Sequence, residues 1–147
     1  MPGRACKVKE QSPIMCYEVR NHLSALPPAV MIHGLAQLRA ALAPQQPVTL
    51  LSAPGAASAW GCLWWQSLLA ACAYAGPALL DCGQAPGRAI EALRLGIRGV
   101  VLAPNPAWAD VSSLARQKQA LLLPAPPVSL DLGQRQAERR LMAWLSP

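Results

Sequence analysis

Four short runs of apolar residues recur along the chain at regular intervals. They begin near residues 48, 78, 99 and 121, and proline or glycine closes each one, as in PVTLLSAPG and RGVVLAPNP. The runs are continuously apolar instead of alternating with polar positions, which is typical of parallel strands buried on both faces. Intervals of about 21 to 30 residues leave room for a crossover helix between successive strands. The pattern therefore predicts four parallel strands separated by helices.

Helical periodicity fills the intervals between these runs. Apolar positions three or four residues apart predict an amphipathic helix from Met31 to Leu42. A second, more apolar helix is predicted over residues 59–75. A third is predicted over residues 88–95, with Gly96 well suited to the left-handed conformation that ends many helices.

Capping residues predict where the last two helices begin. Asn105 followed by Pro106 has the residue types of an N-cap and a first helical position. Asp131 with Gln134 three residues later is similar to a capping box, which opens a final helix in the C-terminal segment.

These elements predict an α/β domain with a small parallel sheet of about four strands and helices on both faces, Rossmann-like or flavodoxin-like. Crossovers between parallel strands are right-handed almost without exception. Four strands cannot close an eight-stranded barrel, so a half-barrel that dimerises is the alternative. A chain of 147 residues fits one domain, which we assign to residues 29–147.

Residues 1–28 lack sustained periodicity. They mix charge, proline and isolated apolar residues, and they end in Leu26-Pro27-Pro28. We expect a loosely ordered N-terminal arm whose deletion leaves cooperative unfolding intact. Met15 and Met31 leave open a later natural start.

No charged residue occurs between Arg39 and Asp81, which makes a membrane span and a phosphate-binding loop the two alternatives to a buried helix. A span needs about 20 apolar positions, but polar residues interrupt the stretch and no basic residues flank it closely, so a membrane span is not favoured. Gly55 and Gly61 match neither a GxGxxG fingerprint nor a P-loop with its lysine. What remains is a loop over residues 52–58 and a helix that Ser58 is expected to N-cap. The free N–H groups of such a helix start can also receive an anion.

The helix predicted over residues 59–75 is apolar almost all round, which normally means burial on more than one side. One side fits the sheet, and the other needs a neighbouring helix or a second subunit. Hydrophobic residues make up 53% of the chain and charged residues 14%, which also favours a partner surface. We therefore assign Trp60, Trp64 and Trp65 to an interface, because tryptophan is enriched in interface cores.

Charge and cysteine content argue against several classes of function. The net charge of +6 is spread evenly along the chain, so nucleic-acid binding is not favoured. The five cysteines form no CxxC pair and are not combined with the two histidines at finger spacing, so no zinc, other metal or cofactor is expected. No secretory signal opens the chain, which predicts a cytoplasmic protein with reduced thiols. The residue usage is typical of a GC-rich bacterial genome.

In parallel α/β folds, ligands bind beyond the carboxyl ends of the strands. This rule selects seven candidate ligand-binding residues: Ser52, Gly55, Ser58, Asp81, Cys82, Arg88 and Asn105. They are expected to hold a small anionic metabolite between the 52–58 and 81–88 loops. The alternative is that these side chains have no ligand. In that case Asp81 caps a turn, Cys82 is an inert buried thiol and Arg88 is solvated.

Catalysis finds little support, because a serine or cysteine nucleophile needs a base. His22 and His33 both precede the first predicted strand. Two functions therefore remain. The first is a non-catalytic domain that acts by association, as a homodimer or as a subunit of an assembly. The second is a small-ligand domain or enzyme that uses the carboxyl ends of the strands.

Overall fold

The computed structural model describes residues 26–147. Its strands and helices follow in chain order: β1 (Ala29–Ile32), α3 (Leu35–Leu42), β2 (Thr49–Ser52), α4 (Ala56–Trp60), α5 (Cys62–Ala71), β3 (Ala78–Asp81), α6 (Pro86–Arg94), β4 (Gly99–Val101), α7 (Trp108–Gln117), β5 (Leu121–Leu123), β6 (Ser129–Asp131) and α8 (Ala137–Leu145). The four apolar runs predicted as strands are β2 to β5. The predicted parallel α/β class is therefore confirmed.

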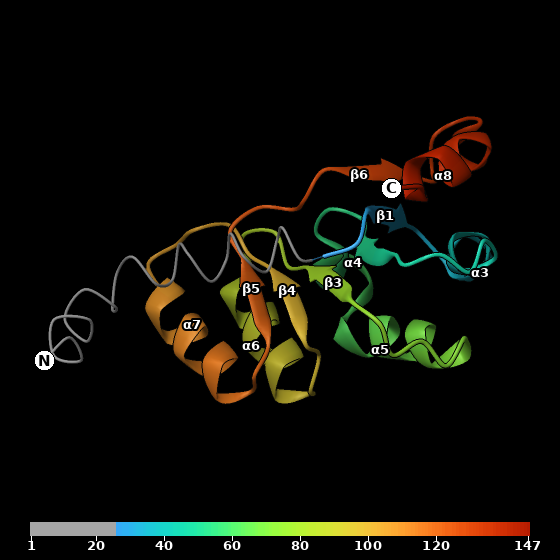
Figure 1. Ribbon diagram of the computed structural model, residues 1–147. Coiled ribbons are helices and arrows are strands. Elements are labelled where there is room, and N and C mark those ends of the chain that lie inside the picture. Colours follow the sequence, from blue (N-terminus) through green and yellow to red (C-terminus); the bar gives the residue numbers. More distant parts are fainter. Residues whose placement is uncertain (1–25) are drawn as a thin grey trace, which may run out of the picture.

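The strands form one six-stranded sheet in the order β5-β4-β3-β2-β1-β6 (Figure 1). Every neighbouring pair is parallel. The chain adds β1 to β5 one after another in the same direction, and then places β6 on the free side of β1. Residues 124–128 make this last connection without a helix. All carboxyl ends of the strands thus meet at one edge of the sheet.

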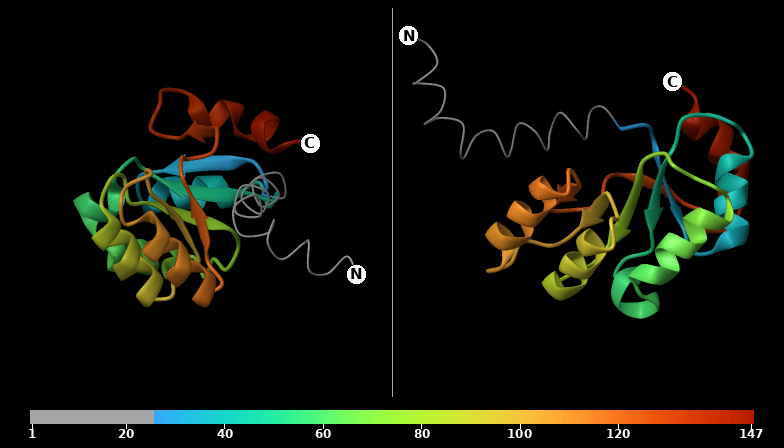
Figure 2. Two further views of the ribbon diagram at one scale, coloured as in Figure 1. Left: turned by 90° about the vertical axis from the view of Figure 1, so that its left-hand side faces the viewer. Right: turned by 90° about the horizontal axis from the view of Figure 1, so that it is seen from below.

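The described helices cover one face of this sheet. The buried side chains of α3 to α8 belong to one apolar cluster, together with strand residues such as Val30, Leu50 and Val100. The alternate strand positions form a second cluster on the opposite face, and within residues 26–147 this cluster contains no helical residue. Right-handed crossovers that always step in the same direction put their helices on the same side. Figure 2 shows these helices following one another along the sheet.

Two parts of the predicted fold need correction. The sheet has six strands instead of about four, and the described helices lie on one face instead of both. Met31 and Ile32 belong to β1 and not to the following helix, which begins at Leu35. The apolar residues of a short strand matched the helical period by chance, which hid the strand. Strand β6 was missed because only Leu130 of its three residues is apolar.

The described end of the N-terminal arm is hydrogen-bonded to the sheet. The backbone N–H of Thr49 donates to the carbonyl of Pro28 at 3.0 Å, and its hydroxyl donates to the carbonyl of Pro27 at 2.8 Å. Residues 1–25, which make up the rest of the expected arm, lie outside the described residues. In the part of the chain that the structure describes, no helix has the length and apolar character needed to cross a membrane.

The apolar segment after β2 is divided by Gly61, whose φ of 91° separates α4 from α5. The N-cap of α4 is Gly55, in the left-handed conformation with φ of 67°. Ser58 lies inside α4, so the prediction that it caps the helix is wrong. Glycine takes this position because the turn out of β2 needs a positive φ, which a side chain disfavours.

Candidate functional site at the carboxyl ends of the strands

Polar side chains stand at the carboxyl ends of four neighbouring strands. Asp131 ends β6, His33 follows β1, Ser52 ends β2 and Asp81 ends β3. The sheet order places these strands side by side. Residues from opposite ends of the sequence thus line one edge of the sheet.

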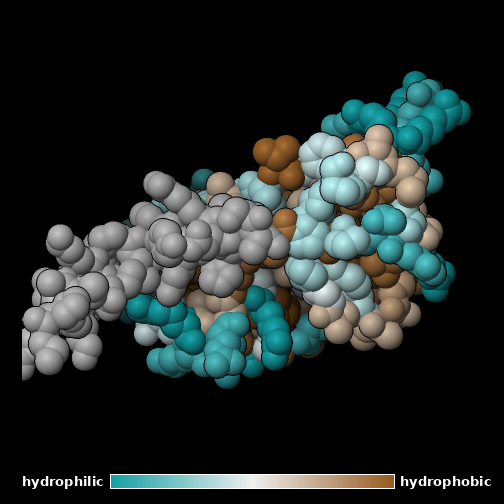
Figure 3. Space-filling model, in the orientation of Figure 1, coloured by the Kyte–Doolittle hydropathy of each residue, from teal (hydrophilic) through white to brown (hydrophobic). Residues whose placement is uncertain are grey.

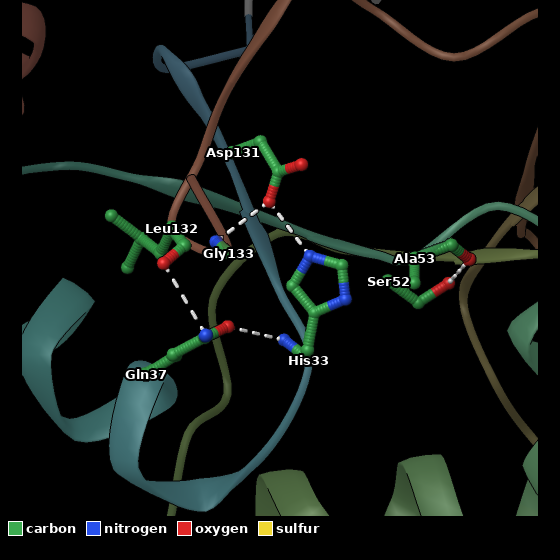
Figure 4. A network of polar contacts seen from close by, with 7 residues as sticks. All are labelled: His33, Gln37, Ser52, Ala53, Asp131, Leu132 and Gly133. Carbon is green, nitrogen blue, oxygen red and sulfur yellow. Dashed lines mark hydrogen bonds and ion pairs between the residues drawn. The ribbon is translucent and has the colours of Figure 1, made fainter. Parts of the chain in front are cut away.

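His33 and Asp131 form a hydrogen-bonded pair across the β1–β6 boundary (Figure 4). The distance from the ring Nε2 to the carboxylate Oδ1 is 2.7 Å. The same oxygen accepts the backbone N–H of Gly133 at 2.8 Å, which fixes the carboxylate in the turn after β6. The two side chains are 39% and 30% exposed, so a molecule in solution can reach the pair.

Gln37, in the first turn of α3, holds the loops on either side of this pair. Its Oε1 accepts the backbone N–H of His33 at 2.7 Å, and its Nε2 donates to the carbonyl of Leu132 at 3.3 Å. One side chain therefore joins the β1–α3 loop to the β6–α8 loop. This contact restricts both loops and positions the ring of His33 (Figure 4).

The contacts of Asp131 favour its charged form. Partial burial acts to raise its pKa and is the largest single effect, but the hydrogen bonds from His33 and Gly133 and the nearby imidazole together act in the other direction. The resulting pKa of Asp131 lies below its ordinary value. The carboxylate is therefore ionised at neutral pH.

Ser52 and Asp81 form a second, more buried polar group at the ends of β2 and β3. The backbone N–H of Asp81 donates to the Ser52 hydroxyl at 2.8 Å, and this hydroxyl donates to the carbonyl of Ala53 at 3.2 Å. The Asp81 Oδ1 accepts the backbone N–H groups of Gly83 at 2.7 Å and Gly55 at 3.3 Å. The aspartate is only 6% exposed. It thus ties the β2–α4 and β3–α6 loops together.

The two loops approach closely through their glycines. Gly55 and Gly83 both have positive φ, and a Cβ placed on Gly83 lies 3.7 Å from the Cα of Gly55. The sequence prediction that the 52–58 and 81–88 loops lie together is consistent with this geometry. Ser52, Gly55 and Asp81 are brought together as expected.

Cys82 is buried beneath this group. Burial raises the pKa of its thiol to about 12, with smaller contributions from Cys62 and Asp81. Burial also raises the pKa of Cys62. Because the thiolate is the reactive form of cysteine, neither thiol has the properties of a nucleophile.

The remaining candidates are engaged locally. Arg88 donates from Nη1 to Glu91 Oε2 at 2.8 Å, one turn along α6, instead of contacting Asp81. Asn105 accepts the backbone N–H of Ala107 and donates to the carbonyl of Ala103, so it shapes its own turn before α7. Ser58 is exposed on α4. These three residues do not join the polar group around Asp81.

Sequence reasoning missed His33, Gln37 and Asp131 as site residues. The sequence pattern predicts a helix start at His33, because β1 also matches the helical period, and a helix cap at Asp131, because β6 has a single apolar residue. The available signal was a polar residue directly after an apolar one at both places, in VMIH and in SLDLG. That signal becomes informative only when β6 is known to lie beside β1.

A separate apolar surface lies on α4 and α5. Trp60 is 66% exposed and Leu63 is 63% exposed. The ring of Trp64 lies against that of Trp60, with centroids 6.0 Å apart. Trp65 is fully buried in the core of the chain itself, so its assignment to an interface is wrong. We name the surface formed by Trp60, Leu63 and Trp64 the tryptophan surface.

Two hollows lie on the described surface, one away from the polar site and one that borders it at Asp131. The larger, about 1150 Å³, lies at the amino ends of β3 to β5 and is lined mainly by apolar residues, with Arg98 and Arg116 as its charged residues. The smaller, about 460 Å³, lies between β6 and α8 and includes Asp131, Arg140 and Trp144. The larger hollow is favoured as a ligand site by its volume alone. The hydrogen-bonded polar groups, however, lie together at the carboxyl ends of the strands. We therefore place the candidate site at the carboxyl edge.

Among residues 26–147, no group of three or more histidine, cysteine, aspartate or glutamate side chains is arranged to hold a metal ion. Comparison of the chain with protein-family models, curated proteins and solved structures found no match in any of the three.

Proposed function

We propose that the protein binds a small polar ligand at the carboxyl ends of β6, β1, β2 and β3. The observation that carries this proposal is the accessible His33–Asp131 pair, with its nitrogen and oxygen 2.7 Å apart. Two further hydrogen bonds from Gln37 hold the loops around the pair. Ligand sites are built in this way, with a few polar groups fixed in position by their surroundings.

The position of the pair in the fold supports a binding role. Ligands of doubly wound sheets and of (βα) barrels both bind at the carboxyl ends of the strands. The consecutive strand order and one-sided helices resemble a segment of such a barrel, and the polar edge is the same in either class. Even where such an exposed pair is ionised, it contributes only about 0–1 kcal/mol to stability. Stability alone therefore gives a weak reason for this pair.

The charges favour a ligand that donates hydrogen bonds over an anion. Asp131 presents a partly exposed carboxylate at this edge, and the carboxylate of Asp81 lies buried there with two loop N–H groups as its donors. Arg88 is the one basic residue of the 52–58 and 81–88 loops, and it is paired with Glu91. An anionic metabolite, which the sequence suggested, would find no unpaired cation in these two loops. A ligand with hydroxyl or amino groups fits the acceptors better.

Nuclear magnetic resonance of the ¹⁵N-labelled full chain tests the proposal. We expect neutral hydroxylated compounds, such as glycerol, D-ribose and D-glucose, to shift the amide signals of Gly34, Gly55, Gly83 and Gly133. Gly96 and Gly99 report on the opposite edge and are expected to stay unchanged. Asp131→Asn is expected to weaken binding, whereas Glu138→Gln on exposed α8 is the matched control. Shifts confined to Gly96 and Gly99 would move the site to the larger hollow and contradict the proposal.

Association is the second candidate function, and the tryptophan surface favours it. Two large apolar side chains are more than half exposed there, and the chain has no charge from residue 40 to residue 80. Figure 3 shows hydrophilic side chains gathered near α6, α7 and α8, while paler, less polar residues lie near α5. Exposed apolar patches on small proteins often mark binding surfaces. The second candidate requires neither His33 nor Asp131.

A further inference from the structure

The hydrogen bond to Asp131 determines which nitrogen of His33 carries the proton. An ionised carboxylate only accepts hydrogen bonds, so the Nε2 that lies 2.7 Å from it must be the donor. A neutral imidazole has one N–H, which leaves Nδ1 with a free lone pair. Figure 4 shows Nδ1 turned away from Asp131, toward the side on which Ser52 lies.

The neighbouring polar groups leave Nδ1 available for a ligand. The hydroxyl of Ser52 is buried and already joins Asp81 to Ala53. Gln37 contacts the backbone of His33 and not its ring. No hydrogen bond to Nδ1 is found among residues 26–147. The ring therefore offers one acceptor, in a fixed direction, to a molecule from solution.

We infer that the ligand carries a hydroxyl group and donates it as a hydrogen bond to Nδ1 of the His33 ring. This inference rests on the proposed function and adds the class of ligand. Asp131 acts as a positioning residue, because it holds the ring through Nε2.

The first experiment examines the ring without a ligand. Long-range ¹H–¹⁵N spectra of the full chain distinguish a proton on Nε2 from one on Nδ1. We expect the His33 ring at neutral pH to carry its proton on Nε2. A ring protonated on Nδ1 would overturn the inference and leave the proposed binding site intact.

The second experiment measures affinity for D-ribose and D-glucose, with D-ribose 5-phosphate as the anionic comparison, in the wild type and His33→Ala. The variant is expected to bind about tenfold more weakly, as for loss of one well-placed hydrogen bond. Lys118→Ala, at the exposed end of α7, is the control.

The outcomes distinguish failure of the inferred hydrogen bond to Nδ1 from failure of the proposed binding site. Equal affinity of wild type and His33→Ala, or tighter binding of the phosphate, would overturn the inference while a ligand site remains. If none of the three compounds shifts the amide signals of Gly34, Gly55, Gly83 and Gly133, the proposed function fails and the inference fails with it.

Discussion

The backbone N–H of Asp81 donates a hydrogen bond to the buried hydroxyl of Ser52 across 2.8 Å, which joins the ends of β3 and β2. This contact gives Ser52 a structural role at the edge where a ligand contact was expected. The carboxylate of Asp81 is used in the same way, since its Oδ1 accepts two loop N–H groups. The more buried half of the polar edge therefore supports the loops, and the more exposed half, at His33, faces solvent.

Ser52→Ala tests the supporting role. The substitution leaves the N–H of Asp81 without its acceptor in a buried position, which costs about 1–3 kcal/mol. Urea denaturation followed by circular dichroism should show this loss in the free energy of unfolding. Ser58→Ala, on the exposed side of α4, is the control and should change it by less than about 0.5 kcal/mol. Equal effects of both substitutions would contradict the assignment.

The cysteines provide a second prediction, on reactivity. Burial raises the pKa of Cys82 from 9.0 to about 12, which lowers its thiolate fraction by about a thousandfold at neutral pH. Cys72 is partly exposed. In native protein treated with iodoacetamide at pH 8, peptide mass spectrometry should show alkylation of Cys72 at least about tenfold faster than of Cys62 or Cys82. Fast alkylation of Cys82 would instead indicate an activated thiol.

Tyr74 gives a prediction on alkaline stability. Its hydroxyl lies 2.7 Å from the carbonyl of Val48 and 3.0 Å from that of Pro77, so it closes the turn before β3. Burial raises the pKa of Tyr74 to about 12. Because this folded-state pKa exceeds the value of about 10 for an exposed tyrosine, the stabilisation is complete below pH 10 and is lost as the pH rises through 12.

Tyr74→Phe is therefore expected to lower the free energy of unfolding by about 1 kcal/mol at pH 7, through loss of the hydrogen bond. The difference between wild type and variant should shrink as the pH rises above 10. Urea denaturation at pH 7 and at pH 10.5 measures both effects. A difference that stays constant between these two pH values would show that the phenol does not titrate as described.

Strands β2 to β5 were predictable because their apolar runs are continuous and closed by proline or glycine. A strand that is buried on both faces needs apolar residues at successive positions, and β2 to β5 show this pattern. Strand β1 was harder to predict, because Ile32 also fits the three-to-four-residue spacing of apolar residues in the helix that follows. The single apolar residue of β6, Leu130, gave too weak a signal to recognise a strand.

Because the sequence pattern does not reveal β1 and β6, it reveals only part of the candidate site. Ser52, Gly55 and Asp81 follow recognised strands, and their closeness could be expected from the rule on carboxyl ends. His33 and Asp131 are 98 positions apart, and their contact depends on β6 pairing with β1. Nothing local in either segment specifies that pairing. It arises because the short connection after β5 delivers β6 to the open side of the first strand.

The tryptophan surface gives the last prediction. Trp60 and Leu63 are exposed on the short helices around Gly61, and burying both against a second copy removes apolar area worth several kcal/mol. A two-fold dimer is the commonest way for a soluble chain to cover such a surface. We therefore expect the wild type at micromolar concentration to have a mass of about twice the 15.6 kDa of one chain, measured by light scattering after size exclusion.

The double substitution Trp60→Ser with Leu63→Ser should shift this mass to that of a single chain, because the apolar contact is removed. Its urea denaturation should remain cooperative, since neither side chain contributes to the core. Trp65→Ala is the contrasting variant, because this ring is fully buried and its removal should cost about 3–5 kcal/mol of stability. A wild-type mass near 15.6 kDa over the whole dilution range would rule out a homodimer. A dimer that persists in the double variant would place the interface away from Trp60 and Leu63.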